Sequence, residues 1–114
     1  MKKSLTKKQI LRLRTDIARV FCSGKAHTVR NLKIIVSLND FSYSRFIIIP
    51  VRHYGNSVKR NYIRKQLKEL WRINQDRIEK GYDCAIVVSK CTNTDFSELQ
   101  DNFIALLKKS GIYE

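Results

Sequence analysis

The fold of this protein is organised around residues 52–72, which read RHYGNSVKRNYIRKQLKELWR. Seven of these residues are Lys or Arg, and one is Glu. The stretch opens with the turn-forming sequence Gly55-Asn56-Ser57, after which apolar residues recur with a helical period. Asn56 or Ser57 can cap a helix, because a short polar side chain accepts hydrogen bonds from the unpaired N–H groups of the first turn. The stretch therefore predicts a long helix that ends at about residue 79.

Two neighbouring faces of this predicted helix differ in character. One is an apolar stripe that seeks a protein core, and it consists of Ile63, Leu67, Leu70, Trp71 and Ile78. The other is a basic ridge, which consists of Asn61, Arg64, Lys65, Lys68 and Arg72. Surface helices usually alternate Glu with Lys at i,i+4 spacing, but here Glu69 is the only acid nearby. A solvated helix face is the alternative, but the concentration of charge favours a surface that binds a polyanion.

The whole chain is short and strongly basic. Its 114 residues are enough for one domain, spanning 1–114, around a single core. The net charge of +13 predicts a polyanionic partner, either nucleic acid or an anionic membrane surface. Residues 1–33 hold ten Lys or Arg and one acid, whereas residues 73–114 hold five Lys or Arg and seven acids. Residues 1–8, with four lysines, are either a disordered tail or an arm that orders against phosphates.

Cysteine and histidine are too few for a standard zinc site. The three cysteines, Cys22, Cys84 and Cys91, show no C-x-x-C spacing, and the two histidines are His27 and His53. We therefore expect free thiols in a reducing compartment, and no metal bound by the protein. The sequence also has no apolar run of membrane-spanning length and no apolar signal-peptide region. Together these features predict a soluble, cytoplasmic protein.

The segment before the basic helix predicts one short helix and two strands. The helix is expected from Asp16 to about Ser23, with Thr15 as its cap and Gly24 as its stop. The strands 31–38 and 43–51 are rich in β-branched and aromatic residues and have a polar turn between them. We expect them to form an antiparallel hairpin.

The segment after the basic helix predicts one strand and one helix. Residues 83–89 have the composition of a buried strand, and Thr94 or Asp95 can cap a final helix that ends at Gly111. The order is α-β-β-α-β-α, with one more short strand expected near residues 25–30. The predicted fold class is therefore α+β, with a single mixed sheet packed against three helices.

The residues needed for autonomous catalysis are missing from the sequence. It contains no nucleophile elbow, glycine-rich phosphate loop or H-E-x-x-H motif. Asp16, Asp40 and Glu69 are the only carboxylates before residue 76, although a two-metal nuclease needs several that converge. His27 and His53 are the only candidates for a metal-free acid–base pair, and nothing in the sequence brings them together. We therefore predict a nucleic-acid binder with no catalytic residues of its own.

Two motifs of the chain resemble those of a known family. Residues 55–69, GNSVKRNYIRKQLKE, resemble the signature of the bacterial ribonuclease P protein subunit, roughly G-N-A-V-x-R-N-x-x-K-R-x-x-R-E. Residues 12–24, RLRTDIARVFCSG, are similar to that family's R-L-x-x-x-D-F-x-x-V-F-x-x-G. The strand 83–89 and the closing helix also fall where the family has them. The resemblance implies a protein that assists a catalytic RNA in removing the 5′ leader of precursor tRNA, with Mg²⁺ bound mainly by the RNA.

The resemblance also implies which residues contact each RNA. The basic loop and helix would bind the catalytic RNA through Arg52, His53, Asn56, Lys59, Arg60, Asn61, Arg64, Lys65 and Lys68. A cleft between the first helix and the sheet would hold the single-stranded leader against Arg14, Ile17, Phe21, Arg30 and Ile35. The family's fold also joins two parallel strands through the basic helix by an uncommon left-handed crossover. Neither DNA nor a membrane is an implied partner.

The chain departs from the family pattern at several of these positions. The family usually has an aromatic residue where Ile17 stands, and often one where Ile35 stands, so Phe21 is the aromatic side chain that remains. Tyr62 replaces a common arginine, and His53 replaces a lysine. The charge pattern by itself equally allows a small ribosomal or ribosome-assembly protein. An autonomous nuclease is a third alternative, against which the missing catalytic groups weigh.

Overall fold

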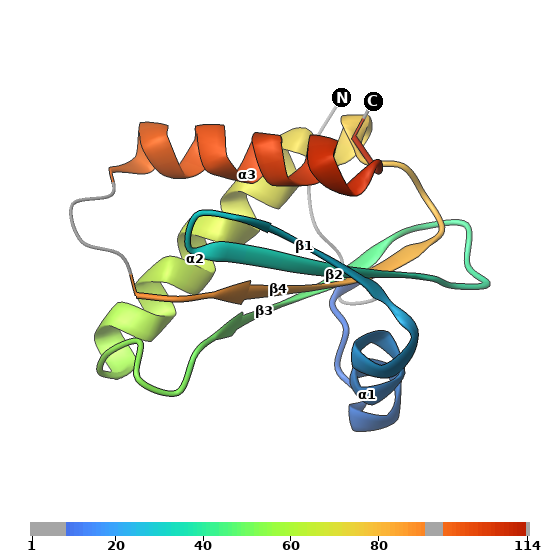
Figure 1. Cartoon of the computed structure of the whole chain (residues 1–114), viewed down its shortest axis with the longest axis horizontal. Coiled ribbons are helices and arrows are strands. Elements are labelled where there is room, and N and C mark those ends of the chain that lie inside the picture. The colour runs from blue at the N-terminus through green and yellow to red at the C-terminus, as the bar shows by residue number, and fades with distance from the viewer. Residues whose placement is uncertain (1–8, 91–94, 114) are drawn as a thin grey trace.

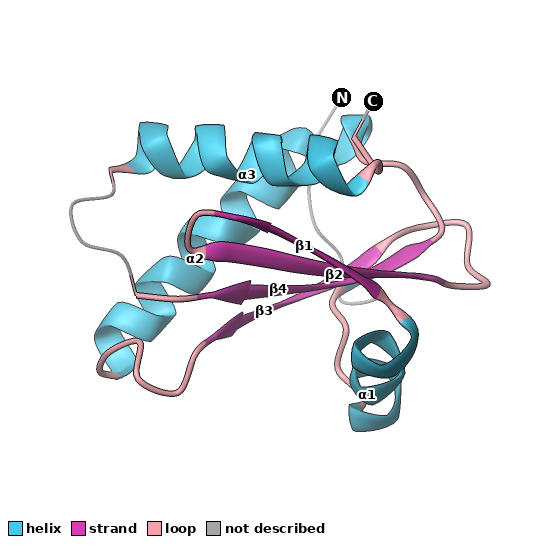
Figure 2. Cartoon of the chain, viewed as in Figure 1, coloured by secondary structure: helices cyan, strands magenta, loops and turns pink. Residues whose placement is uncertain are grey.

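Three helices pack on the two faces of one four-stranded sheet in the computed structural model, which describes residues 9–90 and 95–113 (Figure 1). The helices are α1 (Arg14–Ser23), α2 (Ser57–Asn74) and α3 (Phe96–Ser110), and a short 3₁₀ helix, η2 (Gln75–Arg77), follows α2. The strands are β1 (Lys25–Val29), β2 (Leu32–Leu38), β3 (Arg45–Pro50) and β4 (Tyr82–Val88) (Figure 2). The predicted α+β class and the additional short strand are thus confirmed.

The strand order of the sheet is β1-β2-β4-β3. Strands β1 and β4 each pair with β2 in antiparallel orientation, and β3 runs parallel to β4. The predicted hairpin between 31–38 and 43–51 is therefore wrong, because β4 lies between these two strands. Residues 83–86 of β4 are all fully buried, as suits a central strand. Strand β3 ends at Pro50, which has no N–H to donate, and it takes an edge position.

Helix α2 connects the parallel strands β3 and β4, since such a pair needs a long crossover. The side chain of Asn56 caps it by accepting a hydrogen bond from the N–H of Lys59 at 3.0 Å. The helix ends at Asn74 and not at about residue 79, because the Asn74 side chain donates to the Leu70 carbonyl at 2.8 Å and the chain tightens into η2. Ile78 lies in extended backbone beyond the helix and is also buried in the core. The apolar pattern of the sequence therefore continues past the end of the helix. The left-handed sense of the crossover stays a prediction.

Helix α3 has the predicted ends. The side chain of Asp95 accepts a hydrogen bond from the N–H of Glu98 at 2.7 Å, and Gly111 adopts a left-handed backbone conformation with φ of 83°. Thr94, the alternative cap, lies outside the described residues. The helix buries Leu99, Phe103, Leu106 and Leu107, whose spacing places them on one helical face.

Two clusters of buried side chains hold the layers together. Alternate residues of β2 and β4 face α2 and α3 and form the main core, in which Phe46 and Trp71 stack with ring centroids 4.4 Å apart. The intervening residues Ile35 and Ala85 face the opposite side and pack against Val20 of α1. Figure 1 shows α3 and α1 on opposite sides of the sheet. Helix α1 is thus the single helix that covers its face of the sheet within the described residues.

The end of α1 lies so close to the sheet that it requires glycine. A Cβ atom on Gly24 would lie 2.6 Å from Cγ2 of Ile35 and 2.5 Å from the Val20 carbonyl oxygen. The predicted end of the helix at Gly24 is confirmed. Glycine is required there by this close approach and not by a left-handed backbone, because φ at Gly24 is −80°. The predicted cap at Thr15 is wrong, since the helix begins at Arg14, two residues earlier than predicted, and its cap position is Leu13, whose side chain makes no capping hydrogen bond.

Candidate nucleic-acid interface

Three of the four cations of the basic ridge predicted on α2 are exposed, and within the described residues they have no carboxylate partner. Arg64, Lys65 and Lys68 are all exposed, and Nη1 of Arg64 donates to Oδ1 of Asn61 at 3.2 Å. The fourth ridge cation, Arg72, is paired: the carboxylate of Glu69 accepts its hydrogen bonds, which lower the pKa of Glu69. Among the described residues, no carboxylate forms an ion pair with these three cations.

An apolar groove runs beside this ridge, along the exposed side of the edge strand β3. It has a volume of about 470 Å³, and its lining consists of Ile10, Phe46, Ile47, Ile48, Ile49, Asn61, Arg64, Lys65 and Lys68. The β3 residues at positions 47–49 are only half-buried, because no further strand covers them within the described residues. Three cations on one wall and isoleucines on the floor suit a nucleic-acid strand, whose phosphates are anionic and whose bases have apolar faces.

Arg60 forms hydrogen bonds to the protein backbone that the sequence did not predict. Its Nη1 donates to the Val51 carbonyl at 2.7 Å, and its Nη2 donates to the Pro50 carbonyl at 3.2 Å. These bonds tie the end of β3 to the first turn of α2, and so position the loop that carries Arg52 and His53. Contact between Arg60 and RNA stays a prediction.

The other residues predicted to bind the catalytic RNA lie around the start of α2. Arg52, His53 and Lys59 are exposed in the loop and the first turn. Asn56 is also exposed, but its side-chain oxygen already serves as the helix cap. The predicted residues therefore form a strip from the loop at residue 52 along α2 to Lys68, in which Lys59 lies on a different side of the helix from Arg64 and Lys68.

The residues predicted to bind the leader are only partly brought together. Arg14 and Phe21 are exposed on α1, and Phe21 keeps 45% of its surface accessible, so it is not a core residue. Ile17 is half-buried against the smaller cluster. Arg30 lies in the turn after β1, at the opposite end of that strand from α1. The prediction for Ile35 needs correction, because this side chain is 5% exposed and lies under the end of α1.

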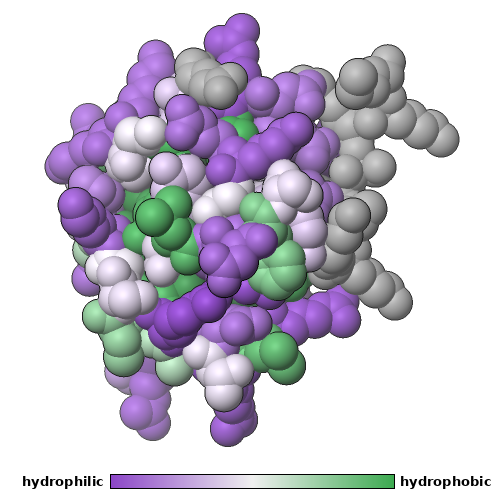
Figure 3. All heavy atoms as spheres, turned by 90° about the vertical axis from the view of Figure 1, so that its right-hand side faces the viewer, coloured by the Kyte–Doolittle hydropathy of each residue, from purple (hydrophilic) through white to green (hydrophobic). Residues whose placement is uncertain are grey.

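Hydrophobic surface is limited on the side where α1 lies. Figure 3 shows small, separate hydrophobic patches there among predominantly hydrophilic side chains. Phe21 is the aromatic side chain that α1 itself exposes.

A buried ion network that the sequence did not reveal holds α1 on the sheet. The fully buried carboxylate of Asp83 accepts from Nε and Nη2 of Arg45 at 2.8 and 2.6 Å, from Nη2 of Arg19 at 2.7 Å and from Nδ2 of Asn39 at 2.8 Å. Asp16 of α1 adds a contact to Arg45 at 3.3 Å. The sequence contained one indication of this network, because Asp83 adjoins the apolar run of a predicted buried strand. A carboxylate that is buried must be paired.

The network sets the charge state of Asp83. Burial opposes ionisation, but the hydrogen bond from Arg45, with those from Asn39 and the charge of Arg19, outweighs it and holds the pKa of this carboxyl below its usual range. The same pairing raises the pKa of Arg45. Arg19 and Arg45 are therefore neutralised by carboxylates, whereas Arg64, Lys65 and Lys68 of the α2 ridge have no such partner among the described residues.

The described residues offer little for metal or redox chemistry. They contain no group of three His, Cys, Asp or Glu side chains that could hold a metal ion. Cys22 is an exposed free thiol, and Cys84 is a buried one whose pKa burial raises. Within the same residues, no helix is both long enough and apolar enough to span a membrane. The predicted arm of residues 1–8 and Cys91 lie outside the described part of the chain.

Known proteins share both the sequence and this fold. The family model described as Ribonuclease P matches residues 5–111. The ribonuclease P protein component of Petrotoga mobilis is 31% identical over 108 residues, which cover 90% of this chain and 92% of the relative. The structure of the RNase P protein from Thermotoga maritima has a TM-score of 0.79 at 27% identity and covers 87% of this chain and 94% of that chain. The RNase P protein from Staphylococcus aureus, at 18% identity, shares the fold with a TM-score of 0.86, covering 93% of this chain and 98% of that chain. Because the family model spans nearly the whole sequence, the chain belongs to the ribonuclease P protein family.

Proposed function

We propose that this protein is the RNA-binding subunit of a ribonuclease P holoenzyme and assists its catalytic RNA in removing the 5′ leader of precursor tRNA. The observation that carries the proposal is the basic ridge of α2, where Arg64, Lys65 and Lys68 lie beside an apolar groove and have no carboxylate partner in the described part of the chain. Such a surface neutralises the closely spaced phosphates of a folded RNA. No observation favours the alternative of a ribosomal or ribosome-assembly protein.

In this proposal the two RNAs contact different faces. The strip from residue 52 to Lys68 binds the catalytic RNA, and the exposed side chains of α1, Arg14 and Phe21, contact the leader. Mg²⁺ acts on the RNA, and the protein contributes cations that bind and orient phosphates. The free thiols Cys22 and Cys84 are compatible with the cytoplasmic location that the sequence predicts.

Cleavage of a precursor tRNA by the cognate catalytic RNA tests the proposal. At low Mg²⁺ we expect the protein to increase the cleavage rate and to raise the affinity for precursor tRNA over mature tRNA. The reason is that protein cations replace part of the charge neutralisation that the metal otherwise supplies. Absence of both effects would overturn the proposal, and cleavage by RNA-free protein would reassign the activity to the protein itself.

Replacing Phe21 with alanine should weaken binding of the leader selectively. Stacking of a base on an aromatic side chain contributes about 1–3 kcal/mol, so we expect lower affinity for precursor tRNA and unchanged affinity for mature tRNA. The comparison is made by equilibrium binding of both tRNAs to the holoenzyme. Phe96→Ala, which removes another exposed phenylalanine, is the matched control and should leave both affinities unchanged. Equal losses for the two tRNAs in Phe21→Ala would show that Phe21 does not contact the leader.

A further inference from the structure

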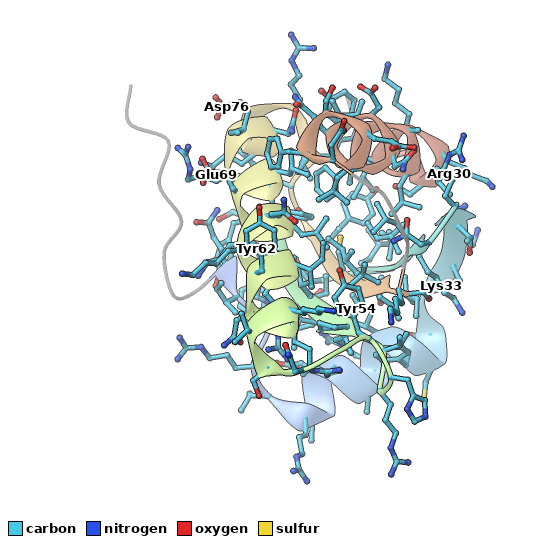
Figure 4. All side chains as sticks on the ribbon, turned by 90° about the vertical axis from the view of Figure 1, so that its left-hand side faces the viewer. Arg30, Lys33, Tyr54, Tyr62, Glu69 and Asp76 are labelled. Atoms are coloured by element: carbon cyan, nitrogen blue, oxygen red, sulfur yellow. The ribbon has the colours of Figure 1, made fainter. Side chains whose placement is uncertain are left out.

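Helix α2 presents a second exposed surface that is apolar and aromatic. Val58 and Tyr62 lie one helical turn apart and are 76% and 64% exposed. Tyr54, in the loop before the helix, is half-buried and packs against the main core. With Lys59 and Lys90, these side chains line a hollow of about 390 Å³. Figure 4 shows Tyr54 and Tyr62 on the same side of the molecule.

This hollow is separate from the groove along β3. The two have no lining residue in common. At 100° per residue, Val58 and Tyr62 are about 40° apart around the helix, whereas on the other side of Val58 Lys65 is about 20° away and Arg64 and Lys68 are about 80° or more away. The basic ridge therefore lies between the apolar core stripe and this aromatic surface, and the same helix can engage RNA on two sides.

The residues that line the hollow indicate which kind of molecule binds there. Scattered apolar residues are normal on a protein surface, but here two exposed side chains adjoin a half-buried ring and are flanked by two lysines. None of the five lining residues is an acid. A second copy of this chain, with a net charge of +13, would place like charges together. An aromatic ring beside cations is instead the arrangement that binds unpaired nucleotides, with bases on the ring and phosphates on the cations.

We propose that Tyr62, supported by Tyr54 and Val58, stacks on an unpaired base of the RNA partner, and that Lys59 and Lys90 bind the adjoining phosphates. The inference rests on the proposed function for its biological partner. The exposed ring of Tyr62 supplies the stacking surface, and Tyr54 supplies a rigid wall because it is anchored in the core. No base-specific hydrogen bond is required, so the contact tolerates any base.

Binding of single-stranded RNA to the full-length protein tests the inference by fluorescence anisotropy. The probes are an oligoadenylate and an abasic ribose-phosphate oligomer of equal length and charge, and all variants carry Phe21→Ala to remove the other aromatic contact. The parent protein should bind oligoadenylate roughly fivefold to 100-fold more tightly than the abasic oligomer. Tyr62→Ala should reduce this ratio towards one, and Tyr62→Phe should retain it.

Two further variants separate stacking from charge. Lys59→Ala should weaken binding of both oligomers to the same degree and leave their ratio unchanged, because both carry the same phosphates. Phe96→Ala is the aromatic control and should change neither affinity. A ratio that Tyr62→Ala does not alter would overturn the inference. So would a dimer of the parent protein, measured by sedimentation, that Tyr62→Ala converts into a monomer.

Failure of the stacking contact can be distinguished from failure of the proposed function. If the protein stimulates precursor-tRNA cleavage but Tyr62→Ala leaves the oligomer ratio unchanged, only the stacking contact is refuted. If the ratio depends on Tyr62 but cleavage is not stimulated, the hollow binds RNA and the ribonuclease P partner is refuted.

Discussion

Replacing Arg64, Lys65 and Lys68 together with alanine is expected to lower the affinity for the catalytic RNA by about a hundredfold at 0.15 M salt. Each cation that neutralises a phosphate releases counterions, so each lost contact also reduces the slope of log affinity against log salt concentration by about one. Titrations of the RNA at several salt concentrations measure both quantities. The free energy of unfolding should change little, because the three side chains are exposed and repel one another.

A matched control separates this effect from net charge alone. Arg77, Lys80 and Lys108 are also exposed, and their replacement by alanine removes the same charge from other parts of the surface. We expect that control to leave the salt slope nearly unchanged. Equal slopes for the ridge variant and the native protein would mean that the ridge is merely solvated and that the RNA binds elsewhere.

Asp83→Asn is expected to destabilise the fold by about 3 kcal/mol at neutral pH, because it leaves the guanidinium of Arg45, whose side chain is 12% exposed, without its main partner. The amide nitrogen of the new side chain is a donor and cannot accept from either arginine. Arg19 is half-exposed and can return to water, so most of the loss comes from Arg45. Urea unfolding monitored by circular dichroism measures the difference, and Asp101→Asn, at an exposed site on α3, should be nearly neutral.

The pH dependence of the same difference identifies its cause. The pKa of Asp83 is lower in the folded chain than in the unfolded chain, so its stabilising contribution is fully present above the unfolded value of about 3.9. That contribution is lost as the pH falls through the folded pKa. The gap in unfolding free energy between the native protein and Asp83→Asn should therefore be constant from neutral pH to about pH 5 and narrow below about pH 4. A gap that persists unchanged in acid would show that packing, and not charge, is responsible.

The helices of this protein could be predicted well because the signals that define them are local. The cap at Asn56, the cap at Asp95 and the glycine at 111 act within a few residues of the chain. The periodic spacing of charged and apolar residues likewise predicted that α2 would present a basic ridge beside a buried stripe. The ridge, and with it much of the candidate RNA interface, was therefore visible in the sequence.

The sheet was less predictable, because local pattern does not specify which strands pair. The strands at 32–38 and 45–50 are adjacent in sequence and composed like a hairpin, yet β4 separates them after the α2 crossover. The β4 strand can occupy the centre because both of its faces are covered, and that depends on where α1, α2 and α3 pack.

The sequence by itself determined that the chain is a basic α+β domain whose α2 helix exposes concentrated positive charge, since charge and helical period are properties of neighbouring residues. Only the tertiary structure decided which basic side chains remain available. Arg45 meets Asp83 across 38 positions, Arg60 is directed to backbone carbonyls at the end of β3, and Ile35 is covered by α1. These outcomes depend on long-range packing. An exposed cation and a paired cation look the same in the local sequence, and only the fold brings the partner of the second one to it.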